Sequence, residues 1–242
     1  MSPTGKVWLV GAGPGAPDLI TLRGWRLLQQ ADSVVHDDLV DPALYGGLSA
    51  ELHDVGKRSG VHKRSQEQIN ALLVELAQRG QRVVRLKGGD PSVLGRAMEE
   101  AIALHQNGVA CEIVPGISSA IAAPILAGIP VTHRGVADSF QVLSAHPRIP
   151  EGPFHLPRYE PWCTLVVLMG VKTLPDWHAL LAEKGYPPEL PVAFITWAGR
   201  PEQRVLVTTV AAALEDARRA GLRSPTVAVL GEVVRLRGHI VG

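Results

Sequence analysis

Short apolar runs and amphipathic segments alternate along the first half of the chain. Four of the apolar runs have the length of β-strands: 7–10, 33–37, 81–89 and 111–116. Apolar residues recur at helical spacing in the segments 18–31, 65–80, 91–108 and 118–128. In the clearest helix, Ser65 and Gln68 form a capping-box pair and Gly80 ends the pattern. This β-α-β-α order predicts a mainly parallel sheet with helices on both faces.

The pattern changes near residue 147, where PRIPEGPFHLPRYEP has five prolines in fifteen residues and is typical of an irregular linker. Beyond it, strand-like runs follow one another closely, at 164–170, 192–199, 205–210 and 226–236, with helices expected near 173–184 and 211–220. Close strand spacing favours a mixed sheet. We therefore predict an α/β protein of two lobes, 1–136 and 137–242.

Composition removes several classes of function. Of the 242 residues, 46% are hydrophobic and 19% are charged, and the formal net charge is +1, so no overall field favours nucleic acid or an anionic membrane. The two cysteines lie far apart, and neither they nor the nine histidines have the spacing of metal ligands, so we expect no metal. With no signal peptide and no apolar run of about 18 residues, we expect a cytoplasmic protein.

The turn GAGPG follows the first predicted strand. Gly11, Gly13 and Ala16 match the dinucleotide fingerprint G-x-G-x-x-G/A, which presents backbone N–H groups to a pyrophosphate. Pro14 has no N–H to offer. The turn is therefore compatible with an NAD(P)-dependent oxidoreductase, but equally with a ligand that lacks phosphates.

Other loops at the carboxyl ends of the predicted strands also carry glycine or charge, and ligands bind at that edge of open α/β sheets. Gly88 and Gly89 would allow a ligand to approach the backbone, and Asp90 could either accept from that ligand or cap the helix predicted at 91–108. The basic segment 55–64 is either a solvated loop or a seat for a substrate with several carboxylates.

Six segments, taken in order and spacing, resemble the tetrapyrrole methylase family: VGAGPG, VVHDDLV, VGKRSG, VVRLKGGDP, VPGISSAIAAPILAGIPVTHRG and TLVVLMG. The likeness runs over nearly the whole chain and is closest to the members that methylate uroporphyrinogen III. It implies the two-lobed fold of that family rather than a Rossmann methyltransferase, S-adenosylmethionine (SAM) bound between the lobes, and a homodimer.

The resemblance also implies an activity and a set of site residues. The activity is methylation of uroporphyrinogen III at C2 and C7, giving precorrin-2 for sirohaem or cobalamin and two S-adenosylhomocysteines. Asp37 and Lys57 would be the acid–base pair, and Arg23, Arg58 and Arg134 would meet substrate carboxylates. The SAM contacts would be Pro14, Gly88, Gly89, Asp90, Val93, Ser118, Ser119, Met169 and Ala198.

The chain departs from the family pattern at several positions that bear on substrate choice: His36, Ser92, Ala97, Met98, Ala145 and Ala198. Three alternatives therefore stay open. The first is methylation of another tetrapyrrole such as a precorrin, the second is the NAD(P)-dependent oxidoreductase, and the third is a non-catalytic protein that binds SAM or a tetrapyrrole.

Overall fold

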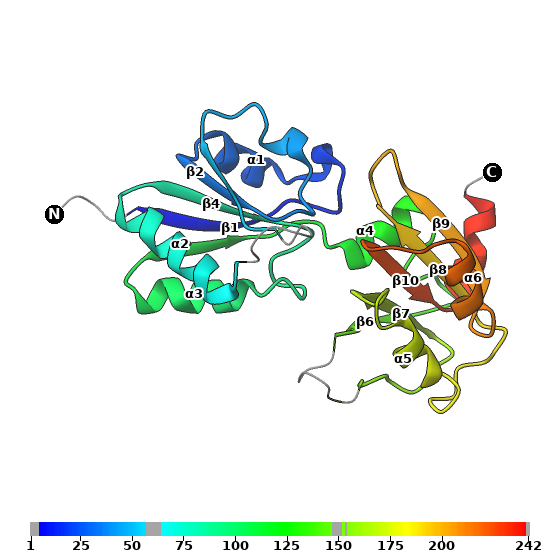
Figure 1. Cartoon of the computed structure of the whole chain (residues 1–242). Helices are drawn as coiled ribbons and strands as arrows, with labels where there is room; N and C mark the ends of the chain where they lie inside the picture. Colours follow the sequence, from blue (N-terminus) through cyan, green and yellow to red (C-terminus); the bar gives the residue numbers. More distant parts are fainter. Residues whose placement is uncertain (1–4, 57–63, 147–151, 153, 241–242) are drawn as a thin grey trace. The chain divides into compact units, whose positions relative to one another are not determined.

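The computed structural model describes residues 5–56, 64–146, 152 and 154–240, and the chain divides into two compact units, Met1–Ser118 and Ser119–Gly242 (Figure 1). This division lies earlier than the boundary expected at residue 136. The reason is packing: Ala120, Ala123 and Ile129 belong to the same hydrophobic cluster as Val166 and Val229 of the second sheet. The segment that follows Ser118 therefore belongs to the core of the second unit.

Within the described part of the first unit, five strands form one parallel sheet: β1 (Lys6–Gly11), β2 (Ser33–His36), β3 (Glu51–Asp54), β4 (Arg82–Lys87) and β5 (Ala110–Val114). Their order is β3-β2-β4-β1-β5. The predicted parallel sheet is confirmed. In a Rossmann sheet β1 and β2 are neighbours, whereas here β4 lies between them, so this sheet is of another kind, as expected. The oxidoreductase alternative loses its structural basis.

Helices cover both faces of this sheet (Figure 1). They are α1 (Leu22–Gln29), α2 (Gln66–Gln78) and α3 (Ala97–Gln106), with short 3-10 turns η1 (Pro17–Leu19) and η2 (Pro42–Leu44). Side chains alternate along a strand, so Leu9 packs toward α2 and α3 while Val10 packs toward α1 and η2. The connections after β1 and β4 cross opposite faces, which makes the carboxyl ends of these two neighbours a topological switch point.

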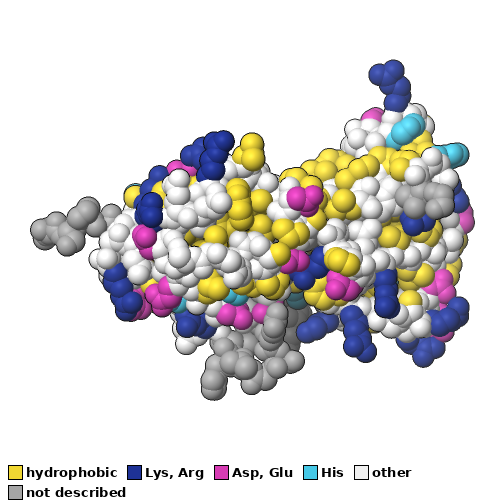
Figure 2. Space-filling model, turned by 90° about the horizontal axis from the view of Figure 1, so that it is seen from above, with side chains coloured by type: hydrophobic (Ala, Val, Ile, Leu, Met, Phe, Trp, Pro, Cys, Tyr) yellow, Lys and Arg dark blue, Asp and Glu magenta, His cyan; other side chains and the backbone are white. Residues whose placement is uncertain are grey.

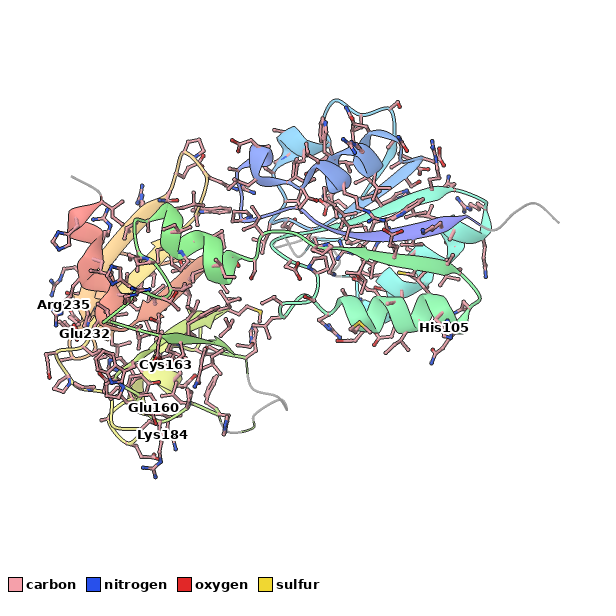
Figure 3. All side chains as sticks on the ribbon, turned by 180° about the vertical axis from the view of Figure 1, so that it is seen from behind. His105, Glu160, Cys163, Lys184, Glu232 and Arg235 are labelled. Atoms are coloured by element: carbon pink, nitrogen blue, oxygen red, sulfur yellow. The ribbon has the colours of Figure 1, made fainter. Side chains whose placement is uncertain are left out.

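The second unit contains β6 (Ser139–Ser144), β7 (Cys163–Leu168), β8 (Pro191–Thr196), β9 (Arg204–Thr209) and β10 (Thr226–Leu230), in the order β6-β7-β10-β8-β9. Strands β6 and β7 are parallel and the other pairs are antiparallel, so the predicted mixed sheet is confirmed. Its helical elements are α4 (Ser119–Leu126), α5 (Leu174–Ala179), α6 (Ala213–Arg219) and the 3-10 segment η3 (Glu232–His239). The pair Glu232–Arg235 (Figure 3), at 2.7 Å, lies on η3.

Two predicted boundaries were wrong for local reasons. The helix expected at 91–108 begins only at Ala97, because Leu94 and Arg96 have left-handed backbones, with φ of 56° and 57°. The strand expected at 226–236 ends at Leu230, where Gly231 has φ of 147° and the chain turns into η3. The capping box of Ser65 and Gln68 is present at the start of α2, as predicted.

Candidate functional site

The loops that follow β1 and β4 are joined by their glycines. The N–H of Gly13 donates to the carbonyl of Gly89 at 3.2 Å, and the N–H of Gly89 donates to the carbonyl of Gly13 at 2.7 Å. A Cβ on Gly11 would lie 2.6 Å from the Gly89 oxygen and from the Cα of Gly116. Backbone therefore meets backbone at the switch point, and a side chain at Gly11 would force the loops apart.

Asp90 ties the loop after β4 to the loop after β5. Its Oδ2 accepts the N–H of Gly116 at 2.9 Å, and its Oδ1 accepts the N–H of Ser92 at 2.8 Å and the Ser92 hydroxyl. Burial raises the pKa of Asp90, but the hydrogen bonds from Ser92, Gly116 and Val93 outweigh it and hold the pKa below its usual value. Since α3 begins at Ala97, Asp90 does not cap that helix.

The loops after β2 and β3 close the same edge of the sheet. A Cβ on Gly56 would lie 2.0 Å from the Asp38 carboxylate, so Asp38 lies directly over that glycine. Gly88 is roomier, since among the described residues a Cβ there would meet only the Cβ of Leu39, at 3.3 Å. The carboxyl edge thus has a glycine-lined part around Gly13 and Gly89 and a polar part around Asp38.

A buried group of charges, which the sequence reading missed, lies beside this edge. Arg85 pairs with Asp37 (Nη2–Oδ1, 2.6 Å) and with Glu100 (Nε–Oε1, 3.2 Å), and Glu100 also pairs with Lys87 (2.9 Å). Burial and the neighbouring charge of Arg85 lower the pKa of Lys87. The available signal was the alternation R-L-K in an apolar strand, which puts both cations on one face of the sheet.

Of the predicted basic residues in the first unit, only Arg23 lies among the described residues, and its ion pair is away from this edge. Arg23 is 68% exposed and pairs with Glu112, which also binds Lys6 at 2.8 Å. Glu112 pairs with Trp8 in the middle of β1, so Arg23 is directed along the sheet rather than to the glycine loops. Lys57 and Arg58 lie outside the described residues.

The other predicted contacts in the first unit belong to the glycine loops. Pro14 and Val93 are half-buried, in the loops after β1 and β4, and Ser118 is buried at the end of the loop after β5. Ser119 is the first residue of α4 in the second unit.

In the second unit, strands β6, β7 and β8 run in the same direction, so their carboxyl ends share one edge of the sheet. Two non-glycine residues there have left-handed backbones: Met169 after β7 (φ 58°) and Trp197 after β8 (φ 53°). Such conformations cost about 1–3 kcal/mol each and are concentrated at functional sites. Ala198 follows Trp197 and is buried. Arg134 is exposed in a tight turn between His133 and Ala137.

The departures from the family pattern have distinct environments. His36 is buried and stacks on Tyr45, with ring centroids 4.1 Å apart. Ala145 is buried in the core of the second unit. Ala97 and Met98 are the first two residues of α3, where the side chain of Ala97 is buried and that of Met98 is exposed. Ser92 donates hydrogen bonds from its N–H and its hydroxyl to the Asp90 carboxylate.

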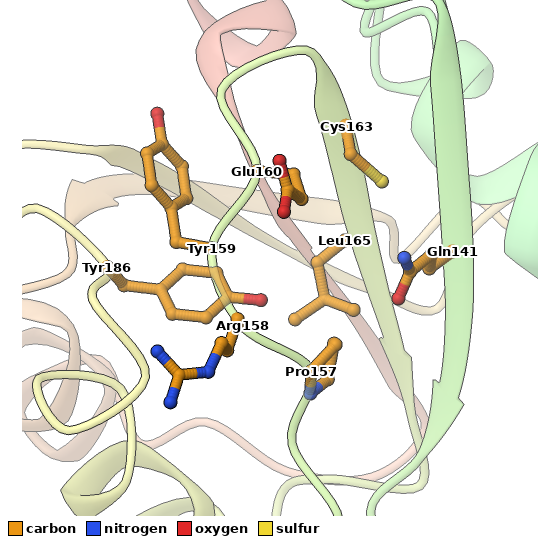
Figure 4. Close-up of a pocket in the computed structure, with 8 residues that line it drawn as sticks. All are labelled: Gln141, Pro157, Arg158, Tyr159, Glu160, Cys163, Leu165 and Tyr186. Atoms are coloured by element: carbon orange, nitrogen blue, oxygen red, sulfur yellow. The ribbon is translucent and has the colours of Figure 1, made fainter.

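Figure 4 shows a cavity in the second unit between Tyr159, Tyr186 and Cys163. Its volume is about 10 Å³, which is room for one water and not for an organic ligand. Both cysteines are free and half-buried, in different units. Among the described residues, no cluster of three or more His, Cys, Asp or Glu side chains could hold a metal ion.

On the face seen in Figure 2, Lys and Arg side chains are interspersed with Asp and Glu rather than collected in a patch of one sign. Within the part of the chain that the structure describes, we find no helix whose length and hydropathy would let it cross a bilayer.

Comparisons with known proteins agree with the architecture. The family pattern of the Tetrapyrrole (Corrin/Porphyrin) Methylases matches residues 6–214. The uroporphyrinogen-III C-methyltransferase of Methanocaldococcus jannaschii is 46% identical over 96% of this chain and 98% of its own. The siroheme synthase of Azotobacter vinelandii is 47% identical over 98% of this chain, but the chain spans about half (52%) of that longer protein.

Among solved structures, the uroporphyrin-III C-methyltransferase of Thermus thermophilus in complex with S-adenosyl homocysteine matches with a TM-score of 0.82. The two sequences are 38% identical, and the match covers 96% of this chain and 94% of that one. The family match extends over most of the chain, and the relatives and the structure agree with it. The chain therefore belongs to the tetrapyrrole methylase family.

Proposed function

We propose that this protein methylates uroporphyrinogen III at C2 and C7, using SAM as methyl donor and producing precorrin-2. The observation that carries the proposal is the likeness, over nearly the whole length of both chains, to the M. jannaschii protein of that name. The complex of the T. thermophilus relative with S-adenosyl homocysteine supports SAM as the donor.

The glycine loops of the first unit fit a cofactor of this kind. Gly13 and Gly89 bring bare backbone to the carboxyl edge, and Pro14 offers no N–H donor, which suits a ligand without phosphates. When bound, SAM supplies an activated methyl group, and the protein supplies binding and orientation. We assign its contacts to Pro14, Gly88, Gly89, Asp90, Val93, Ser118, Ser119, Met169 and Ala198.

The remaining assignments concern the substrate. A pyrrole carbon of the porphyrinogen would attack the methyl group in line, and Asp37 would take up a proton released as the ring rearranges, with Lys57 as its partner. The acetate and propionate groups of the substrate would be met by Arg58 and Arg134. Arg23 would join them only by leaving Glu112.

We further propose that the protein works as a cytoplasmic homodimer whose product feeds sirohaem or cobalamin synthesis. Light scattering coupled to size-exclusion chromatography tests the assembly, and a monomer at micromolar concentration would exclude the dimer.

The decisive experiment is incubation with SAM and uroporphyrinogen III under reducing, anaerobic conditions, followed by mass spectrometry. The proposal requires a gain of two methyl groups and two S-adenosylhomocysteines per product. If SAM binds but no methyl is gained, the substrate is wrong, and precorrins are the next to test. If SAM binds and no substrate of the class yields S-adenosylhomocysteine, the protein is a non-catalytic binder. Titration with NADH, where we expect no binding, tests the oxidoreductase alternative.

A further inference from the structure

We propose that Arg85 is a positioning residue for this reaction: its guanidinium holds the Asp37 carboxylate in place at the carboxyl edge of the first sheet. The inference rests on the proposed function, because that function makes Asp37 the group that takes up the proton. Arg85 itself would not touch the substrate, since its side chain is only 3% exposed.

The link between Arg85 and Asp37 follows from strand register. In the β2–β4 pair, Arg85 lies opposite Val35, and Asp37 is two residues further along the chain, just beyond the end of β2. Arg85 Nη2 donates to Asp37 Oδ1 at 2.6 Å. Nη1 of the same guanidinium donates to the carbonyls of Leu86 (3.2 Å) and Val35 (3.4 Å). The guanidinium is thus fixed to the backbone of both strands while it holds the carboxylate.

The other side of the guanidinium is held by α3. Glu100 is fully buried, and its Oε1 accepts from Arg85 Nε at 3.2 Å, from Lys87 Nζ at 2.9 Å and from Gln66 Nε2 at 3.3 Å. Two cations and two anions balance the group. Arg85 therefore has partners on β2, β4 and α3 and beyond the end of β2, and all three of its guanidinium nitrogens donate hydrogen bonds.

The group is poorly explained by stability alone. Charges taken out of water lose hydration, and buried ion pairs can usually be replaced by apolar side chains without loss of stability. What distinguishes this group of charges is that it is buried at one end and accessible to solvent at the other. Glu100 and Arg85 are almost inaccessible, whereas Asp37, at its outer end, is 32% exposed. The buried members connect the core to one accessible carboxylate.

The geometry leaves one oxygen of Asp37 for chemistry. Oδ1 is engaged by Arg85, while Oδ2 has no hydrogen-bond partner within the described ranges. Arg85 stays charged at any working pH, because a guanidinium is not deprotonated in proteins. It can hold the carboxylate without competing for the proton. Without the hydrogen bond from Arg85 the Asp37 carboxylate could rotate. Small misplacements of a reacting group cost up to about 10²-fold in rate.

The test is a double-mutant cycle in the full-length enzyme with Arg85→Gln, Asp37→Asn and the combination. We expect R85Q to lower kcat 10- to 100-fold and to change the Kd for SAM less than about threefold. Because the two residues act as one unit, the double variant should be no slower than D37N. A double variant slower than D37N by the full factor that R85Q costs alone would overturn the proposal.

Two further variants separate positioning from folding. R85Q/E100Q removes one cation and one anion, so the net charge of the buried group stays zero. If R85Q alone fails to fold, R85Q/E100Q takes its place and should show the same 10- to 100-fold loss of kcat. Arg82→Gln is the matched control, because Arg82 pairs with Asp32 at the amino ends of the same two strands. R82Q should keep the wild-type kcat. If the kcat of R85Q equals that of R82Q, Arg85 does not position Asp37 for the reaction.

A crystal structure of R85Q/E100Q gives a readout that does not depend on turnover. The Asp37 carboxylate should leave its wild-type position or occupy more than one rotamer, and an unchanged position would refute the inference. If the wild type does not methylate uroporphyrinogen III, the proposed function fails, while this comparison still decides whether Arg85 holds Asp37.

Discussion

The Asp90 carboxylate fastens the loop after β4 to the loop after β5 by accepting the N–H of Gly116 at 2.9 Å. The same carboxylate also organises its own loop through Ser92. One side chain therefore holds together two of the three glycine loops at the switch point, and the shape of the candidate cofactor site depends on it.

Replacing Asp90 with alanine should loosen the site and weaken SAM binding. We expect the free energy of unfolding to fall by about 1.5–3 kcal/mol, the usual contribution of hydrogen bonds to a charged group, and the Kd for S-adenosylhomocysteine to rise at least tenfold. Calorimetric titration and urea unfolding measure the two effects. Ser92→Ala, which removes only the hydroxyl bond, is the control and should cost far less. Equal Kd values for D90A and wild type would remove Asp90 from the site.

The depressed pKa of Asp90 predicts a pH dependence of stability. Its pKa is lower in the folded than in the unfolded chain, where an aspartate has a pKa of about 3.9. Its stabilising contribution is therefore complete above that value and is lost as the pH falls through the folded pKa. The difference in unfolding free energy between wild type and Asp90→Asn should be constant from pH 8 to pH 5 and shrink below pH 4. A difference that grows on acidification would contradict this sign.

Gly116 should not tolerate a methyl group. A Cβ there would lie 2.4 Å from the carbonyl oxygen of Gly89 and 2.7 Å from the Cα of Gly11, and neither backbone can move without opening the loops. Gly116→Ala should cost about 1–3 kcal/mol, as overpacking does, and weaken SAM binding. Gly47→Ala is the control, because no atom of the described residues lies within 4 Å of a Cβ at that position. Thermal unfolding of both variants decides the matter, and similar melting temperatures would disprove the close approach.

Asp37→Asn and Lys57→Met test the proposed acid–base pair. Loss of a general acid or base costs about 10²–10⁴-fold, so we expect kcat to fall by that order while SAM binding persists. Lys172→Met, at an exposed lysine of the second unit, is the control. Single-turnover methyl transfer measures chemistry separately from binding. Full activity in both variants would exclude the pair from the reaction.

Met169→Gly should separate the backbone conformation from the side chain. Met169 has φ of 58° and is 42% exposed, so glycine would relieve left-handed strain and lose little burial. We expect the second unit to gain up to about 1 kcal/mol. If the Met169 side chain also contacts SAM, its affinity should fall in the same variant. Lower stability in urea unfolding would show that the strain is not relieved.

Local sequence patterns predicted most of the strands and the glycine loops at their carboxyl ends, but not β6 (Ser139–Ser144). Apolar runs such as 7–10 and glycine turns such as GAGPG are local signals, and they were right because strand formation and turn geometry depend mainly on neighbouring residues. Local signals also misled where the backbone was unusual: nothing in the pattern near Arg96 reveals the left-handed conformation that delays α3.

The way these elements meet is visible only in the folded protein. The tertiary structure placed β4 between β1 and β2, assigned the segment after Ser118 to the second core, and brought Arg85 onto both Asp37 and Glu100. It also paired Arg23 with Glu112, so that any role of Arg23 at the substrate would require breaking this ion pair. The physical reason is common to all of these. Strand order, burial and ion pairing depend on groups far apart in the chain, and their energies exist only once the sheet has formed.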